Sequence, residues 1–163
     1  MATTDPQTSL KHAVPRPPRE LVESPTYLLK RLGFAIKERS MDAFEEAGFS
    51  PYQHAVLALL DEDPKETQAM IADALGYDRS HLVGLLDELE GQGLIVRKRD
   101  PSDRRRHLVN LTPEGKKALK QLRALAKDVE DEFLGTLDAD QRRQLHALLL
   151  EVAVARDPRL GEN

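Results

Sequence analysis

Apolar residues recur at steps of three and four along most of the chain, a spacing typical of amphipathic helices. The clearest stripe consists of Leu82, Leu85, Leu86 and Leu89. Five other segments show the same spacing, and the one that starts at Pro113 extends over more than twenty residues. We expect helices to begin at residues 25, 51, 68, 79, 113 and 139.

Residues that favour helix termini stand at the ends of these segments. Ser24, Ser50 and Thr112 each precede a proline, so that a hydroxyl caps the early amides and proline takes a position that needs no amide. Thr67 and Asp78 are expected to cap the third and fourth helices. The stretches SPYQ and DADQ also have the spacing of a capping box. Glycines after the first, third and fourth helices indicate where these helices end.

The hydrophobic period drops to two between residues 94 and 111, which predicts strands. Leu94 and Val96 alternate with Ile95, Arg97 and Arg99, the turn signal DPSD follows, and HLVNL alternates again. This segment is therefore predicted to be a β-hairpin with cations at its tip. Just before it, two short helices meet at a tight Gly-Tyr-Asp joint, which indicates a helix-turn-helix. A helix-turn-helix followed by a hairpin is a winged helix.

The predicted fold class is mainly α with a small β-hairpin wing. Residues 49–112 would form a winged helix-turn-helix DNA-binding region, and residues 24–48 and 113–156 a helical dimerisation region. The apolar stripes of the terminal helices exceed what one thin lobe can bury, so we expect a homodimer, although an intramolecular core would give the same stripes. Residues 1–23 are rich in proline, and we expect an extended arm that docks across the dimer.

Charge is segregated along the chain. The 163 residues are 40% hydrophobic and 32% charged, with a net charge of −4, which describes one soluble globular domain. Residues 97–106 contain six basic and two acidic residues, or +4, so the rest of the chain carries −8. The net negative charge of the rest of the chain disfavours nonspecific binding to polyanions. The local cationic loop can still bind one specific polyanion.

A winged helix would use these cations to bind double-stranded DNA. The second helix of the pair fits the major groove, about 12 Å wide, and its first turn would point Arg79, Ser80 and His81 at base edges and phosphates. The hairpin would reach the adjacent minor groove, where negative potential favours arginine. The expected wing contacts are Arg99, Arg104, Arg105 and Arg106. The alternative is a winged-helix adaptor that binds protein without DNA, against which the three consecutive arginines argue.

Other classes of function lack their sequence signals. The chain has no cysteine, which excludes disulfides and thiol chemistry. Its five histidines lack the spacing of a zinc site, and the motifs of P-loop, dinucleotide-binding, metalloprotease and serine hydrolase enzymes are missing. We therefore expect no metal, no cofactor and no enzyme activity. Without an apolar run of about 18 residues or a signal peptide, we expect no membrane partner and a cytoplasmic location.

Three stretches together resemble the MarR family of bacterial regulators, named for multiple antibiotic resistance. They are SPYQHAVLALL, DRSHLVGLLDELEGQGLI and RDPSDRRRHLVNLTPEG, of which the last is the most specific. The resemblance covers residues 25–153. It implies a homodimer that binds a pseudo-palindromic operator, represses transcription, and is released by an anionic or aromatic small-molecule effector.

The resemblance also implies roles for single residues. Arg104 or Arg106 would enter the minor groove, and Asp87 would pair with Arg105 to hold the wing against the recognition helix. Asp87 lies near the helix C-terminus, where a carboxylate is unfavourable unless it is paired. Gly84 departs from the family pattern, because a longer polar or basic residue often occupies this position. Either the DNA backbone approaches closely there, or recognition is shifted onto the helix N-terminus.

The resemblance places the effector pocket at the junction of the two regions. Aromatic and basic residues come from helices that would border this junction, where they could line a pocket or simply pack. These candidates are Tyr27, Phe34, Lys37, Tyr52 and His54.

Overall fold

A computed structural model describes residues 15–62, 66–101 and 107–161. The chain divides into two units, residues 1–35 and residues 36–163. The first unit contains α1 (Arg19–Val22) and the beginning of α2 (Pro25–Glu46). The arm was expected to be extended, but α1 is a helical turn inside it, and Glu23 accepts a hydrogen bond from the Arg19 guanidinium at 2.6 Å. Residues 1–14 lie outside the described residues.

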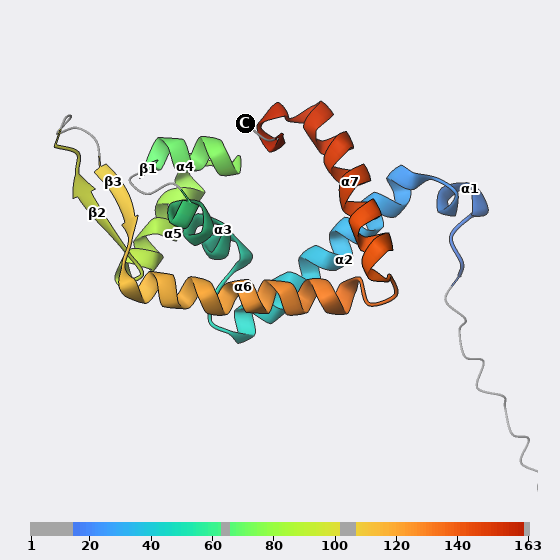
Figure 1. The fold of residues 1–163 in the computed structure, drawn as a ribbon, viewed down its shortest axis with the longest axis horizontal. Helices are drawn as coiled ribbons and strands as arrows, with labels where there is room; N and C mark the ends of the chain where they lie inside the picture. Colours follow the sequence, from blue (N-terminus) through green and yellow to red (C-terminus); the bar gives the residue numbers. More distant parts are fainter. Residues whose placement is uncertain (1–14, 63–65, 102–106, 162–163) are drawn as a thin grey trace, which may run out of the picture. The chain divides into compact units, whose positions relative to one another are not determined.

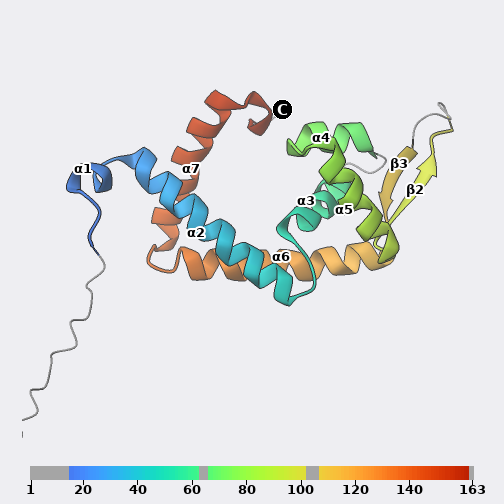
Figure 2. The same cartoon turned by 180° about the vertical axis from the view of Figure 1, so that it is seen from behind.

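The second unit contains the winged helix and two C-terminal helices. The sheet lies at the N-terminal end of α6, and α3, α4 and α5 gather beside it (Figures 1 and 2). The elements, in chain order after α2, are α3 (Pro51–Glu62), β1 (Glu66–Thr67), α4 (Gln68–Leu75), α5 (Arg79–Gly91), β2 (Ile95–Arg99), β3 (His107–Leu111), α6 (Pro113–Phe133), α7 (Ala139–Arg156) and the 3-10 turn η1 (Pro158–Leu160).

The predicted hairpin is confirmed, with β2 and β3 antiparallel and Arg97 opposite Val109. The sheet also has a third strand that the sequence did not predict. Strand β1 pairs with β3 through Glu66 and Thr67, so the order is β1-β3-β2. Two residues are too few to show an alternating pattern, which is why only the structure reveals this strand.

The predicted helix caps are confirmed by hydrogen bonds. The amide of Gln53 donates to the Ser50 hydroxyl at 3.2 Å, and the Gln53 side-chain oxygen accepts from the Ser50 amide at 2.9 Å. The Thr67 side chain accepts from the Met70 amide at the start of α4, and the Asp78 side chain accepts from the Ser80 and His81 amides at the start of α5. Between these two helices Gly76 has a φ of 66°, the left-handed conformation that ends a helix at little cost for glycine. These caps fix the short joint of the helix-turn-helix.

One apolar core holds the winged helix together. The stripe Leu82, Leu85, Leu86 and Leu89 on α5 is buried, as its spacing predicts. Three of its residues, Leu82, Leu86 and Leu89, pack in one cluster with apolar residues from α3, α4, the sheet and the first half of α6. The main partners are Leu57, Leu60, Ile71, Ile95, Val109, Leu119 and Leu122.

Helix α7 differs from the other long helices. It starts at a capping box made by Asp138 and Gln141, and the Arg142 guanidinium donates to Asp131 of α6 at 2.6 Å. The structure describes α7 in full, and it contains no buried residue. Its apolar stripe therefore faces outward within the single chain, with Leu148 56% and Val152 58% exposed.

Candidate nucleic-acid interface

The first turn of α5 projects its side chains into solvent. Arg79, Ser80 and His81 are all exposed, whereas Leu82 directly after them is fully buried. The Asp78 carboxylate accepts hydrogen bonds from the amides of Ser80 and His81 at 2.8 and 3.3 Å. The three predicted contact residues therefore lie together at the capped end of the recognition helix.

The N-terminal cap also determines what Ser80 can offer to DNA. Its hydroxyl donates to the Asp78 carboxylate, and this bond, together with those from the two amides, lowers the pKa of Asp78. Because the single hydroxyl hydrogen is already used, the Ser80 oxygen can only accept a further hydrogen bond. Arg79 and His81 are the residues of this turn that can donate.

Three aromatic rings meet beside this turn. The His81 ring lies 5.2 Å from the ring of Tyr52 and 6.1 Å from that of Tyr77, with interplanar angles of 88° and 64°. The two tyrosine rings are 5.6 Å apart at 76°. Burial, and the proximity of Tyr52, raise the pKa of Tyr77, so its phenol is neutral. In the sequence Tyr77 was noted only as the middle residue of the Gly-Tyr-Asp joint, because one aromatic residue in a turn gives no pattern that marks it as part of a site.

The next exposed positions on α5 are Val83 and Gly84. Val83 is 39% exposed, although β-branched apolar residues are usually buried. An exposed valine gives the recognition helix an apolar side chain that can contact a thymine methyl group in the major groove. A Cβ added at Gly84 would meet no atom within 4 Å. Nothing within the described residues therefore requires glycine at this position.

A cluster of charges ties the wing to the recognition helix. The Arg97 guanidinium lies 2.7 Å from the Asp87 carboxylate and 2.5 Å from that of Glu90, and the Arg97 amide also donates to Glu90 at 3.0 Å. Hydrogen bonds from Arg97 lower the pKa of Glu90, and those to Glu90 and Asp87 raise the pKa of Arg97. On the neighbouring face of α5, the Glu88 carboxylate accepts a hydrogen bond from the side-chain Nε2 of Gln53 at 3.0 Å.

Arg97 has a structural role that the sequence did not predict, because it was counted only in the charge of residues 97–106 and not among the expected site residues. The predicted link between Asp87 and the wing exists, but the partner that the structure describes is Arg97 of β2. The predicted partner, Arg105, lies outside the described residues, so that pair stays a prediction. The alternating pattern contained the signal, because Arg97 falls on the same strand face as buried Ile95 and so points toward α5.

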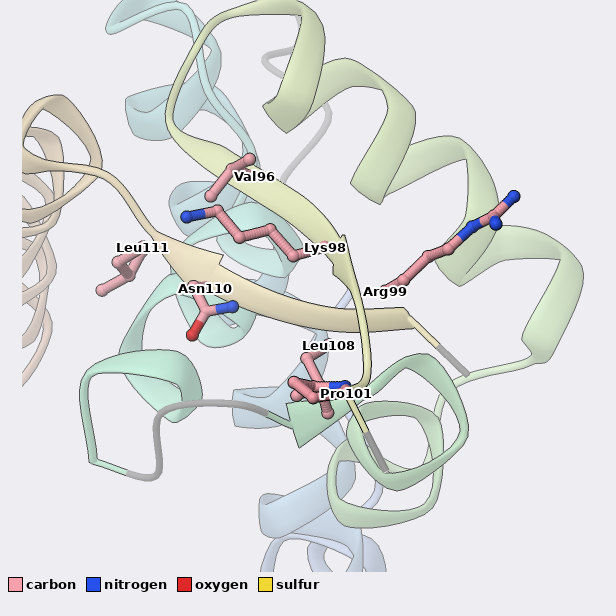
Figure 3. A pocket seen from close by; sticks show the side chains of 7 residues that line it. All are labelled: Val96, Lys98, Arg99, Pro101, Leu108, Asn110 and Leu111. Carbon is pink, nitrogen blue, oxygen red and sulfur yellow. The ribbon is translucent and has the colours of Figure 1, made fainter. Parts of the chain in front are cut away.

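Two exposed cations, Lys98 and Arg99, lie near the outer end of β2. Figure 3 shows them projecting in opposite directions from the strand. Both line one pocket, together with Val96, Pro101, Leu108, Asn110 and Leu111. Arg99 is exposed at the end of the strand opposite His107. Arg104, Arg105 and Arg106 lie outside the described residues, and their predicted DNA contacts stay predictions.

Known proteins share this sequence and architecture. Residues 49–107 match the sequence profile of the MarR family. A transcriptional regulatory protein for the hcr operon of Thauera aromatica is 31% identical over 126 residues, which cover 72% of this chain and 76% of that protein. The repressor CouR bound to a 23-mer DNA duplex is 39% identical with a TM-score of 0.75, covering 83% of this chain and 96% of that one. The chain belongs to the MarR family.

Membership in the MarR family makes the protein a DNA-binding transcriptional regulator with a winged helix. A second structure, CouR from Rhodococcus jostii RHA1 bound to p-coumaroyl-CoA, is 30% identical with a TM-score of 0.69 and again covers 83% of this chain and 96% of its own. The curated relatives are transcriptional regulators, not enzymes.

The effector-pocket candidates of this MarR protein are divided by the structure. Tyr52 and His54 are two residues apart on α3 and so face different sides of the helix. The Tyr52 ring lies beside His81, whereas the His54 ring lies 5.5 Å from that of Phe44 in α2. Burial, followed by the nearby charge of Arg123, lowers the pKa of His54.

The remaining candidates lie on α2. Tyr27 is half-buried, and Phe34 and Lys37 are exposed.

Within the ranges that the structure describes, no three His, Asp or Glu side chains are placed to hold a metal ion. Among the helices of the described residues, none combines the length and the hydrophobicity of a transmembrane span.

The charge cluster predicts how acid affects this MarR winged helix. Because the pKa of Glu90 is lowered in the folded state, its pairing with Arg97 stabilises the fold above the unfolded pKa of ~4.3. That stabilisation is lost as pH falls through the lowered folded pKa. We expect Glu90→Gln to reduce the free energy of unfolding at neutral pH by about 1 kcal/mol or less, since the pair is partly solvent-screened. Wild type and variant should converge once the pH falls below the lowered pKa of Glu90 in the folded state.

Urea unfolding between pH 3 and 7 measures this difference. In an Arg97→Met background the carboxylate has lost its principal partner, so Glu90→Gln should have little further effect at any pH. A difference between wild type and Glu90→Gln that persists unchanged at pH 3 would contradict the assignment.

Proposed function

We propose that this protein is a repressor that binds a pseudo-palindromic operator as a homodimer and is released by a small molecule. The observation that carries the proposal is the single rigid face made by α5 and the wing. Its contact residues sit on a capped helix end, and Arg97 fixes β2 to that helix. Two such faces in successive major grooves would lie about 34 Å apart.

The homodimer rests on the outward apolar stripe of α7. An apolar stripe of this kind on a soluble protein marks an association surface. We assign residues 24–48 and 113–156 to dimerisation, residues 49–112 to DNA binding, and residues 1–23 to an arm. A closed two-fold dimer presents two equal winged helices, which matches a pseudo-palindromic site.

The effector is proposed to be an anionic or aromatic molecule. The structure of CouR with p-coumaroyl-CoA supports this class, because that ligand is both aromatic and anionic. Half-buried His54, beside Phe44, offers an aromatic surface and a polar nitrogen. We retain Tyr27, Phe34, Lys37 and His54 as candidate contacts. The effector must bind the DNA-incompetent state more tightly, since only differential affinity shifts a population.

The proposal includes no catalytic activity for this chain. The regulatory role of the curated relatives supports that view. Because the proposed operator is chromosomal DNA, we place the protein in the cytoplasm.

Selection from a random duplex library tests DNA recognition directly. The full-length protein should enrich a two-fold related sequence, and operator affinity should fall steeply with salt concentration. A ligand screen for release of the selected duplex then identifies the effector class. If the selection enriches no sequence at low salt, the proposal of sequence-specific DNA binding is wrong.

The wing arginines should add to affinity through the minor groove. We expect Arg104→Ala or Arg106→Ala to weaken operator binding and to lower the slope of log affinity against log salt by about one for each lost contact. Fluorescence anisotropy over a salt series measures both quantities. Arg143→Ala, which removes an exposed arginine of α7, is the matched control and should leave the slope unchanged. Wild-type slopes in both wing variants would exclude the wing from DNA binding.

A further inference from the structure

His81 is held at its backbone by the N-terminal cap of its own helix and at its ring by two other parts of the chain. Its amide donates to the Asp78 carboxylate at 3.3 Å, which fixes the backbone. Its ring meets the ring of Tyr52 from the first turn of α3 and that of Tyr77 from the joint between α4 and α5. An exposed side chain on a helix normally samples several rotamers. Here two rings from different elements restrict the imidazole.

The ring geometry favours this restriction. Aromatic pairs are most stable when the positive edge of one ring meets the negative face of another. The angles of 88°, 64° and 76° within the cluster are all of the edge-to-face kind, and the centroid separations of 5.2 to 6.1 Å lie in the favourable range. Tyr77 is itself fixed by its amide, which donates to the Ala72 carbonyl at 3.0 Å.

The ring nitrogens of His81 are available to a ligand. Neither forms a hydrogen bond within the part of the chain that the structure describes. The side chain is exposed, so an approaching duplex can reach it. In the same first turn of α5, the Ser80 hydroxyl already donates its hydrogen to the Asp78 carboxylate. His81 thus combines a restricted orientation with a free donor.

We propose that Tyr52 and Tyr77 are positioning residues that hold the His81 ring so that its N–H reads one base pair of each operator half-site. The acceptor is the N7 or O6 atom of a purine in the major groove, where these atoms face an inserted helix. The tyrosines act through His81 and determine specificity at that base pair. This inference rests on the proposed function.

The experiment compares base preferences of full-length variants on the selected operator. Duplexes carrying each substitution at each position give a penalty profile by anisotropy at fixed salt. We expect His81→Ala to remove a penalty of roughly 5- to 150-fold at one position per half-site. Tyr52→Ala should reduce that same penalty at least threefold. Tyr52→Phe should keep it, because the ring makes the contact and the hydroxyl does not.

Combining the substitutions distinguishes positioning from general weakening. In a His81→Ala background, Tyr52→Ala should not change the profile further, since no ring remains to be held. A merely destabilised protein would lose affinity for every duplex by the same factor. If Tyr52→Ala fails to fold, Tyr52→Leu preserves apolar volume and carries the same expectation.

Two outcomes overturn the inference. Either the penalty at the His81 position survives in Tyr52→Ala, or all positions change equally. If the wild-type protein binds all duplexes equally, the proposed function itself is wrong. That outcome can be distinguished from failure of the inference about His81, because it is seen with the wild-type protein before any variant is made.

Discussion

Replacing Gly115 with alanine should destabilise the winged helix by about 3 kcal/mol, the upper end for overpacking a well-filled site. Gly115 is buried in the first turn of α6, and a Cβ there would lie 2.0 Å from the Leu94 carbonyl oxygen and 3.2 Å from a Leu111 methyl carbon. The oxygen belongs to the backbone and is held in place, because it accepts a hydrogen bond from the Thr112 amide at 3.0 Å, and the Thr112 hydroxyl donates to the neighbouring Gly93 carbonyl at 2.7 Å. The added carbon would therefore force α6 away from the sheet and break the cap.

Urea unfolding at one protein concentration measures the effect, since the stability of an oligomer depends on concentration. The midpoint should fall while the m-value stays constant. Gly84→Ala is the matched control, because it adds the same carbon in open space on α5. There the better helix propensity of alanine should stabilise the protein by about 1 kcal/mol. Equal stability of wild type and Gly115→Ala would show that Gly115 and the Leu94 carbonyl are not as close as the structure places them.

The same control decides between the two interpretations of Gly84. If the DNA backbone approaches this point closely, Gly84→Ala should lose operator affinity although it gains stability. If recognition is shifted onto Arg79, Ser80 and His81, affinity should be unchanged. Binding and unfolding measurements on this one variant separate the alternatives.

The sequence alone was sufficient for most of the fold because the informative signals are local. Helix caps such as Thr67 and Asp78 act within three residues, and the apolar stripe of α5 follows directly from the helical period. Strand β1 escaped prediction because it depends on a partner, β3, about forty residues away. The requirement for glycine at 115 is equally non-local, since it comes from the Leu94 carbonyl across the fold.

The candidate site was predicted only in part for the same reason. Spacing placed Arg79, Ser80 and His81 on one turn, but it could not show that Ser80 bonds Asp78 or that two tyrosines surround His81. Tyr52 was grouped with the effector residues because its position in the sequence gives no direction for its ring. The orientation of a side chain such as Tyr52 is set by packing between helices, and a single sequence does not show which helices pack together.

Charges placed in the apolar stripe of α7 should separate the two subunits. We expect Leu148→Glu combined with Val152→Glu to convert the dimer to monomers, because each subunit would bury two carboxylates without partners in the interface. The fold of the monomer should survive, since α7 contributes no buried residue to it. Operator affinity should fall by about 100- to 10,000-fold, because each winged helix then binds its half-site without the effective concentration supplied by its partner.

Light scattering coupled to size exclusion measures the mass, circular dichroism the helix content, and anisotropy the operator affinity. Ala147→Glu places a carboxylate at an exposed position on the opposite side of α7 and should change none of the three. The affinity of the double variant for a single half-site duplex should match that of wild type, because the contact face itself is intact. Dimeric mass with undiminished operator affinity in the double variant would exclude α7 from the association surface.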